Sequence, residues 1–365
     1  MYGGPKGGGG LSSVPHSFIG HKRILLVRPD RIGDVLLSTP AIEALRKALP
    51  EAYLVALVAP HAREIVDLNP YLNRIILFEK KGKHKGLWGM VRLVRELKGY
   101  QFDTAAVLHG TCRIHLALAL AGIPKRLGYD RKWGFLLTKR LKDVKVRGEK
   151  HEAAYTVDVV RALGVDLREG RVFMPTTFES DIRMERFLKE KGVTEEDRLV
   201  AIHPGASSIS KRWMSDRFAK VADTLQEWNY KVIIVSGPAD VATGQAVIQS
   251  MKRPPIDACG KTTVRELASL LKKTRLLISN DSGPVHVAVG VETPVISIFG
   301  RSQPGLSQKR WRPLGEGDVV LQKDVGCPIC LADDCQIDFE CLKALSVEEV
   351  LEAARCILDK KRNHE

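Results

Sequence analysis

Short apolar runs alternate along the chain with longer segments in which apolar and charged residues recur at helical spacing. Runs rich in Val, Ile and Leu predict strands buried on both faces, because a strand with one solvated face would alternate apolar and polar residues. In the first half these runs are Ile24–Arg28, Tyr53–Val58, Ile75–Phe78 and Thr104–Leu108. In the second half they are Leu199–His203, Lys231–Ser236, Leu276–Ser279 and Pro294–Phe299.

The segments between these runs predict amphipathic helices. They include Pro40–Leu49, His61–Asp67, Leu87–Leu97, Asp216–Trp228, Ala239–Met251, Val264–Leu271 and Pro284–Gly290. This alternation of strand and helix is typical of parallel sheets covered by helices, and it occurs twice. We therefore predict an α/β protein built from two doubly wound, Rossmann-like lobes.

The length of 365 residues is too great for one ordinary domain and suits two. We expect a flexible, Gly-rich extension at 1–20, a first lobe at 21–172, a second lobe at 173–345 and a final helix within 346–365. That helix, over Val347–Leu358, either caps its own lobe or returns to the first one. The hydrophobic pattern does not decide between these placements.

The net charge of the chain indicates what kind of partner it binds. The chain has 57 Lys and Arg against 43 Asp and Glu, a net charge of +14, with several basic clusters in the first half. This favours an anionic partner for the first lobe, although a generally basic protein is the alternative. No nucleic-acid recognition motif is evident. No apolar run approaches the ~18–20 residues that span a bilayer, so we expect a cytoplasmic location, with peripheral contact at the inner membrane as an option.

The first polar motif, RPDRIGDVLLSTP, follows the first predicted strand. Ligands of open α/β sheets collect at the carboxyl ends of strands, so Asp34 in this motif is a candidate for chemistry. Gly33 is expected to let the backbone turn tightly. Pro40 suits the first turn of a helix that begins near Leu36, which would leave Asp34 in a loop. A helix N-cap is the alternative role for Asp34, and spacing alone favours neither.

The second polar motif, HPGASSISKRW, follows the first strand of the second lobe. The hydroxyls of Ser207 and Ser208 and the ammonium of Lys211 suit a diphosphate, because hydroxyl donors fix its oxygens and a cation offsets its charge. The spacing is not that of a Walker loop. A polar surface loop without a ligand is the alternative.

The third polar motif is SNDSGPVHVA, residues 279–288. Ser282 is expected to cap a helix that begins at Gly283, and the free amides at such a helix start bind anions. Asp281 suits sugar hydroxyls beside this anion site. His286 lies in the first turn and within reach of the same ligand, although a lone histidine is more often a packed core residue.

A weaker candidate is Asp240, which follows another strand and suits either a ribose hydroxyl or a helix cap. Three polar strand ends in the second lobe predict a nucleotide-diphosphate site, and the Asp34 motif predicts the acceptor side. The absence of a G-x-G-x-x-G fingerprint counts against the main alternative class, a nucleotide-binding oxidoreductase.

The ordered set of Arg31-Ile-Gly-Asp34, the His203 loop ending in Lys211-Arg-Trp213, and Asn280-Asp-Ser-Gly-Pro-Val-His286 resembles the bacterial lipopolysaccharide heptosyltransferases of glycosyltransferase family 9. The resemblance runs from His21 to Leu358. It implies the GT-B fold, with two facing lobes and a C-terminal helix that returns to the first lobe. It also implies inverting transfer of heptose from ADP-L-glycero-D-manno-heptose to the inner core of lipopolysaccharide, with no cofactor required for catalysis.

The resemblance also implies roles for single residues. The aspartate matching Asp34 acts as base, and the lysine matching Lys211 meets the donor diphosphate. The acid matching Asp240 binds ribose. The loop that surrounds the donor sugar and phosphates matches Asp281, Ser282, Gly283 and His286. Candidates to meet an anionic acceptor are Arg31, Arg113, Arg126 and Arg131. The alternatives are a glycosyltransferase with another donor or acceptor, and a non-catalytic sugar-nucleotide-binding protein.

Four of the seven cysteines cluster near the C-terminus, at Cys327, Cys330, Cys335 and Cys341. Such crowding in a protein expected in the cytosol points to a metal more than to disulfides, and C-x-x-C is half of a zinc knuckle. The second pair does not match standard zinc spacing. Structural zinc, disulfides and free thiols are therefore all retained as hypotheses.

Overall fold

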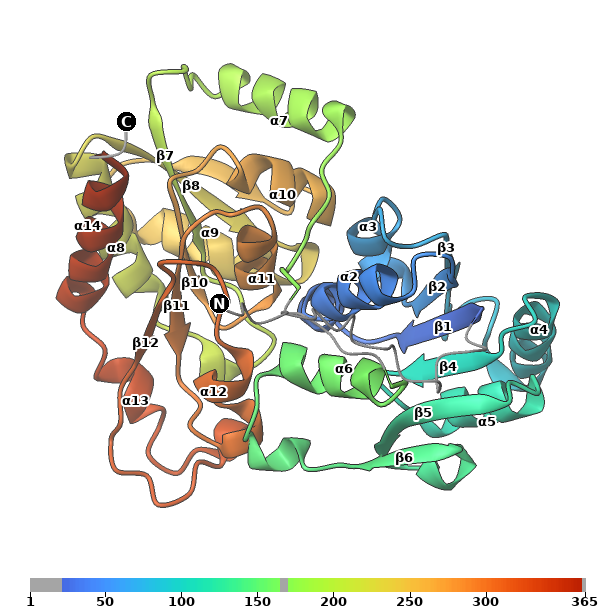
Figure 1. The fold of residues 1–365 in the computed structure, drawn as a ribbon. Helices are drawn as coiled ribbons and strands as arrows, with labels where there is room; N and C mark the ends of the chain where they lie inside the picture. Colours follow the sequence, from blue (N-terminus) through green and yellow to red (C-terminus); the bar gives the residue numbers. More distant parts are fainter. Residues whose placement is uncertain (1–21, 165–169, 363–365) are drawn as a thin grey trace, which may run out of the picture.

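The computed structural model describes residues 22–164 and 170–362, so the extension predicted at 1–20 lies outside the described residues. The chain forms two lobes, and within the described ranges each is built on a parallel sheet of six strands. The strand orders are β3-β2-β1-β4-β5-β6 and β12-β11-β10-β7-β8-β9, which is the same doubly wound order in both lobes. Figure 1 shows the lobes side by side. The predicted fold class is confirmed.

The bounds of the elements follow the chain. The first lobe contains β1 (Arg23–Arg28), α1 (Ile32–Leu36), α2 (Thr39–Ala48), β2 (Tyr53–Val58), η2 (Pro60–Ala62), α3 (Arg63–Val66), β3 (Arg74–Leu77), α4 (Gly86–Gly99), β4 (Thr104–Val107), α5 (Cys112–Leu120), β5 (Lys125–Asp130), η3 (Gly134–Leu136), β6 (Lys139–Lys142), η4 (Lys145–Arg147) and α6 (Glu152–Arg161). The second lobe contains α7 (Phe178–Glu190), β7 (Arg198–His203), η5 (Ile209–Lys211), α8 (Ser215–Glu227), β8 (Tyr230–Ser236), η6 (Pro238–Asp240), α9 (Val241–Ser250), β9 (Ile256–Cys259), α10 (Val264–Leu271), β10 (Leu276–Asn280), α11 (Gly283–Gly290), β11 (Val295–Phe299), η7 (Pro304–Leu306), α12 (Gln308–Trp311), β12 (Val319–Gln322), η8 (Ala332–Asp334), α13 (Glu340–Lys343) and α14 (Val347–Arg362).

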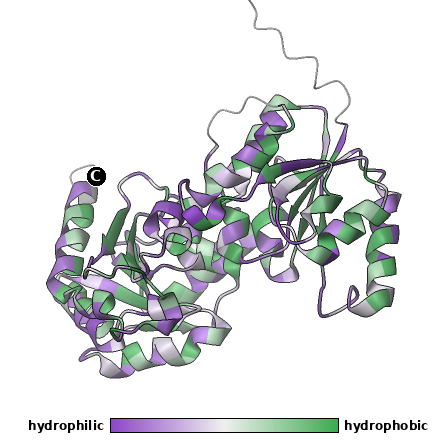
Figure 2. Cartoon of the chain, turned by 90° about the horizontal axis from the view of Figure 1, so that it is seen from below, coloured by the Kyte–Doolittle hydropathy of each residue, from purple (hydrophilic) through white to green (hydrophobic). Residues whose placement is uncertain are grey.

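Both faces of the first sheet are buried, as its apolar strands predict. Leu25 and Val27 of β1 belong to a cluster that includes apolar residues of α4 and α5. Their neighbours Ile24 and Leu26 point to the other face, into a cluster that continues into the second lobe through residues such as Val285 of α11. The lobes therefore share apolar contacts. Figure 2 shows the covering helices with apolar and polar residues interspersed along their length.

The C-terminal helix α14 packs on its own lobe. It contacts α8 and the strands β10 and β11. Its buried Val350, Ala354 and Leu358 belong to the apolar cluster of the second lobe. In Figure 1 this helix lies on the outer side of that lobe, away from the first one. The return to the first lobe that the resemblance implied is therefore wrong for the described part of this helix.

Removal of apolar contacts from α14 is expected to destabilise the second lobe. Leu358→Ala should lower the free energy of unfolding by about 2–5 kcal/mol, because the lost methyl groups leave a cavity in a core that only partly relaxes. Urea unfolding followed by tryptophan fluorescence measures the change. Glu352→Ala, at an exposed position of the same helix, is the control and should change stability by less than about 0.5 kcal/mol. Equal unfolding midpoints for the two variants would contradict the packing of α14.

Candidate active site

The topology gathers the three polar motifs. In each doubly wound sheet the winding direction reverses at the central strands, between β1 and β4 in the first lobe and between β7 and β10 in the second. Ligands of such sheets bind outside the carboxyl ends of strands at this reversal. The Asp34 motif follows β1, and the motifs with Lys211 and Asp281 follow β7 and β10. All three therefore lie at the predicted ligand positions of their sheets.

Asp34 lies in the middle of the five-residue helix α1, whose N-cap is Arg31. It is neither a helix cap nor a loop residue, so both placements considered from the sequence are wrong. The hydroxyl of Ser38 donates to the backbone oxygen of Asp34 at 2.8 Å, just after α1 ends. A second helix, α2, then begins with Pro40 in its first turn, as predicted.

The carboxylate of Asp34 is paired with Arg28, the last residue of β1. Nη2 of Arg28 lies 2.7 Å from Oδ1 of Asp34, and Nε of Arg28 lies 2.9 Å from Oδ1 of Asp30. Burial raises the pKa of Asp34 above its ordinary value, against the opposing charge of Arg28. A carboxylate with a raised pKa is a better proton acceptor at the pH where it is still ionised.

Asp30 differs from Asp34 in its surroundings. Its Oδ2 lies 3.1 Å from Nδ1 of His109, which follows β4. Burial opposes the charge of Asp30, but Arg28 and His109 outweigh it and hold the pKa of Asp30 below its ordinary value. Asp34 is therefore the more basic of the two neighbouring acids.

The two loops of the second lobe are tied together by Asn280. Its side-chain oxygen accepts from the backbone N–H of Trp213 at 3.0 Å, and its amide donates to the backbone oxygen of Pro204 at 2.7 Å. This brings Lys211 to Asp281, where Nζ lies 2.5 Å from Oδ2. One cation and one buried carboxylate thus stand just before α11, whose first amides lack helical partners.

Ser282 is the N-cap residue of α11, but its hydroxyl makes no capping hydrogen bond. It lies instead 3.2 Å from Nδ1 of His203 and 3.1 Å from the hydroxyl of Ser279. Burial lowers the pKa of His203 to about 4 and that of His286 to about 3. Both imidazoles are therefore neutral at neutral pH, and the first amides of α11 are not capped by Ser282.

The hydroxyls of the β7 loop meet a residue that the sequence did not single out, Arg301. Ser207 is exposed, whereas Ser208 contacts both Arg301 and Asp333. Ser210 donates to Oδ1 of Asp333 at 2.7 Å and accepts from Nε of Arg301 at 2.6 Å. Two hydroxyls and a guanidinium form a donor set that also suits a phosphate.

Asp240 stands at the start of α9 without a side-chain capping hydrogen bond, so the cap considered for it is not formed. Its Oδ1 lies 3.3 Å from Nη2 of Arg212 in the β7 loop. A Cβ on Gly205 would lie only 2.8 Å from Cβ of Asp240. The absent side chain therefore lets the β7 loop approach this carboxylate closely.

The four arginines predicted to meet the acceptor differ in their contacts within the protein. Arg113 and Arg126 donate to backbone carbonyls of their own lobe. Nε of Arg131 lies 3.8 Å from Oδ2 of Asp143, and Arg31 is exposed at the N-cap of α1, the helix that carries Asp34. Arg113 and Arg126 thus hold the backbone of their own lobe, whereas Arg31 is exposed to solvent.

The two lobes touch at the start of α1 and α11. A Cβ on Gly33 would lie 2.9 Å from Cδ2 of His286 and 3.6 Å from Cα of Gly283. The backbone of Gly33 is helical and has no positive φ, so the tight turn expected at this residue is wrong. The missing side chain instead gives α11 room to approach the residue next to Asp34.

The cysteine cluster forms no disulfide: Cys327, Cys330, Cys335 and Cys341 are free thiols, which contradicts the disulfide hypothesis. Within residues 22–164 and 170–362, no group of three or more His, Cys, Asp or Glu side chains is arranged to hold a metal ion. The zinc hypothesis thus gains no support from the arrangement of these thiols.

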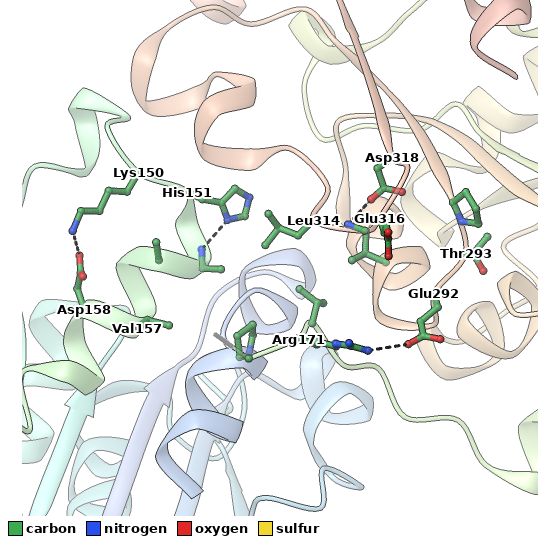
Figure 3. Close-up of a pocket in the computed structure, with 18 of the residues that line it drawn as sticks. Lys150, His151, Val157, Asp158, Arg171, Glu292, Thr293, Leu314, Glu316 and Asp318 are labelled. Atoms are coloured by element: carbon green, nitrogen blue, oxygen red, sulfur yellow. Dashed lines mark hydrogen bonds and ion pairs between the residues drawn. The ribbon is translucent and has the colours of Figure 1, made fainter. Parts of the chain in front are cut away.

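A cavity of about 1000 Å³ lies between the lobes along α6 (Figure 3). Its walls include His151 and Asp158 of the first lobe and Glu292 and Asp318 of the second. The residues from the second lobe precede β11 and β12, at the amino ends of these strands. The cavity contains neither Asp34 nor Lys211, so we do not assign the donor to it.

None of the helices in the described ranges combines the length and the apolar character needed to cross a membrane.

Comparison with known proteins identifies the family. Residues 90–339 match the model of glycosyltransferase family 9 (heptosyltransferase). The chain belongs to this family. Lipopolysaccharide heptosyltransferase 3 of Escherichia coli (strain K12) is 29% identical over 296 residues, covering 79% of this chain and 84% of that protein. This glycosyltransferase also resembles, with a TM-score of 0.85 and 27% identity, the crystal structure of a family 9 protein from Veillonella parvula, over 93% of this chain and 98% of that one.

The structure of a heptosyltransferase with a bound nucleotide sugar has the same fold. It is Escherichia coli heptosyltransferase WaaC with ADP-2-deoxy-2-fluoro heptose, at a TM-score of 0.66 and 15% identity, over 90% of this glycosyltransferase and 98% of that chain.

The contact between α1 and α11 leads to a prediction about Gly33. Gly33→Ala would push the lobes apart, because His286 is buried and has little room to move. We expect kcat/KM to fall by about 10²-fold, as for a ~1 Å misplacement of reacting groups, and the free energy of unfolding to fall by about 1–3 kcal/mol because the contact is overpacked. Gly99→Ala, where an added Cβ meets nothing within 4 Å, is the control. Wild-type kcat/KM for Gly33→Ala would show that this close approach is not needed for turnover.

Proposed function

We propose that this glycosyltransferase moves heptose from ADP-L-glycero-D-manno-heptose to the inner core of lipopolysaccharide, with inversion, at the cytoplasmic face of a membrane. The observation that carries the proposal is the contact of α1 with α11. It brings the helix that carries Asp34 in one lobe against the start of α11 in the other, just after the Lys211–Asp281 pair. The names of the lipopolysaccharide heptosyltransferases to which the chain is similar support a heptosyl donor and a lipopolysaccharide acceptor.

The proposed reaction is a single displacement. Asp34 accepts the proton of an acceptor hydroxyl while that oxygen forms a bond to the anomeric carbon of heptose. The bond between this carbon and the diphosphate oxygen breaks, and its electron pair leaves with ADP. Lys211 and the first amides of α11 stabilise the charge that develops on the diphosphate. Asp240 is assigned to the ribose, and Asp281 with His286 to the donor sugar.

On the acceptor side we assign Arg31, and second Arg131, to the anionic groups of the lipopolysaccharide precursor. Arg31 adjoins α1 and is exposed. A guanidinium at this place would bind a phosphate or carboxylate of the acceptor while the reacting hydroxyl of the acceptor faces Asp34.

The donor and acceptor are tested directly. The purified protein is incubated with ADP-heptose and defined truncated lipopolysaccharide acceptors, and the products are read by mass spectrometry. We expect a gain of one heptosyl residue on an inner-core acceptor. Transfer from another nucleotide sugar would overturn the proposed donor, and a rise in melting temperature with ADP but no product would favour the non-catalytic binding protein.

Asp34→Ala is expected to lower kcat by about 10²–10⁴-fold and leave the affinity for ADP unchanged, because the proton acceptor and the donor site lie in different lobes. In the wild type, activity should fall as the pH decreases through the raised pKa of Asp34, above the ordinary value of about 3.9 for an aspartate. Steady-state kinetics and calorimetry measure both effects. Glu51→Ala, at an exposed position of the same lobe, is the control. Near-normal kcat for Asp34→Ala would refute its role as base.

Lys211→Ala should weaken ADP binding by roughly 10- to 100-fold, since it removes a charge-assisted contact and leaves Asp281 as an uncompensated carboxylate. Isothermal titration calorimetry with ADP measures the loss, and circular dichroism verifies the fold. Lys220→Ala, an exposed lysine of α8, serves as the matched control. An unchanged dissociation constant for Lys211→Ala would remove this residue from the donor site.

A further inference from the structure

A cluster of buried charges crosses the boundary between the lobes at Glu152, the first residue of α6. The side chain of Glu152 is 1% exposed, and its Oε1 lies 2.9 Å from Nη2 of Arg28 and 3.1 Å from Nζ of Lys145. Its Oε2 accepts from Arg310 twice, from Nη2 at 2.7 Å and from Nε at 2.9 Å. Arg310 belongs to α12 of the second lobe, whereas the other three residues belong to the first. Figure 1 shows α12 next to the segment that leads into α6.

The same cluster reaches Asp34. The Nη2 atom of Arg28 that contacts Glu152 also lies 2.7 Å from Oδ1 of Asp34. One nitrogen is therefore shared by two carboxylates. A continuous series of hydrogen bonds runs from Arg310 through Glu152 and Arg28 to Asp34, and only its first member lies in the second lobe.

Glu152 keeps its charge at every pH of interest. Burial opposes that charge, but Arg28, Lys145 and Arg310 outweigh burial and lower the pKa of Glu152 to about 2. Its permanent negative charge competes with Asp34 for Arg28. Arg310 reduces this competition, because it takes up Oε2 of Glu152 with two donors.

Stability alone does not account for such an arrangement. Burying four charges costs solvation energy that their attraction often does no more than offset. Apolar contacts already join the lobes, through a cluster that spans both. A cation from the second lobe at this place does something that an apolar residue would not: it adjusts the charge next to Asp34.

We propose that Arg310 and Glu152 are positioning residues: while the two lobes are in contact, Arg310 offsets the charge of Glu152, so that Arg28 can keep Asp34 ionised and oriented. With Arg310 on Glu152, Glu152 competes less strongly for the shared Nη2 atom of Arg28, which then holds Asp34. When the lobes separate, Glu152 draws Arg28 to itself and Asp34 loses part of its cation. The base would then be prepared only in the closed enzyme, which limits proton transfer without a bound donor. This inference rests on the proposed role of Asp34.

The charged groups around Asp34 determine whether each substitution raises or lowers its pKa. Negative Glu152 and Asp30 raise its pKa, while Arg28 and His109 lower it. From α11, His286 approaches Gly33, the residue before Asp34, and burial keeps this imidazole neutral. Loss of Arg310 should therefore raise the pKa of Asp34, and loss of the Glu152 charge should lower it.

The test is the pH dependence of kcat/KM for the full-length enzyme. The acid limb of this pH profile is the fall in kcat/KM at low pH, which follows protonation of Asp34. We expect Arg310→Gln to move the acid limb to higher pH by about half a unit or more, and Glu152→Gln to move it to lower pH. In the double variant the limb should match that of Glu152→Gln, since Arg310 acts through Glu152. Arg310→Lys should restore the limb toward the wild-type position. Because Arg310→Gln and Arg310→Lys leave Glu152 intact, these two variants test the proposal even if Glu152→Gln does not fold.

A matched control comes from a second ion pair between the lobes. Arg265 of α10 contacts Asp67 and donates to the backbone oxygen of Glu64 at 3.2 Å, in a contact that does not include Arg28. Arg265→Gln should leave the acid limb unchanged. Equal limbs for Arg310→Gln and Arg265→Gln, or the same shift from Arg310→Gln with and without Glu152, would overturn the coupling. If Asp34→Ala retained its kcat, the proposed base itself would fail; if that variant lost kcat while the limb of Arg310→Gln stayed in place, only the coupling would fail.

Discussion

One buried guanidinium, that of Arg28, connects the fold to the chemistry. Its side chain is 4% exposed, and a charge so far from water is costly unless it is paired. Burial opposes its charge, but Asp30, Asp34 and Glu152 together raise its pKa. Because Arg28 ends β1, the central strand next to the reversal of the sheet, the core fixes its position. The three carboxylates are arranged around a cation that the fold itself holds in place.

The hydrophobic pattern predicts the strands that this fold buries most deeply. The runs expected at the central strands agree with β1, β7, β10 and their neighbours within one or two residues. The pattern misses β5, β6, β9 and β12, of which three are edge strands. The letters of β5 and β6, KRLGYD and KRLK, contain few apolar residues because these strands are partly exposed. Parallel pairing in the sheet, rather than local composition, makes them strands.

The site is predictable to a similar depth. Polar motifs that follow apolar strands place Asp34, Lys211 and Asp281 at strand ends. The strand order of each sheet then places these strand ends next to the reversal of winding direction. What the sequence does not reveal are partners fixed by tertiary contacts: Glu152 lies 124 positions from Arg28, and Arg310 lies 158 positions from Glu152. No local spacing marks such pairs. The short helix that carries Asp34 was missed for a related reason, since five residues are too few to show a period.

In the second lobe, the cations suited to bind a phosphate are already paired with carboxylates of the same chain: Lys211 with Asp281, and Arg301 with Asp333. The two pairs differ in the exposure of the carboxylate, and this difference bears on how a nucleotide sugar would bind. Asp281 is buried beside Lys211, with a side chain 7% exposed. Displacing it from Lys211 would be costly, because little water could solvate the unpaired carboxylate. Asp333 is 56% exposed where it meets Arg301, and water can solvate it when it leaves. A diphosphate that replaced Asp333 would keep the hydroxyl and guanidinium contacts and release a carboxylate into solvent. Asp281 would stay and orient Lys211, so exchange at Asp333 would be the less costly way for the proposed anionic donor to enter this lobe.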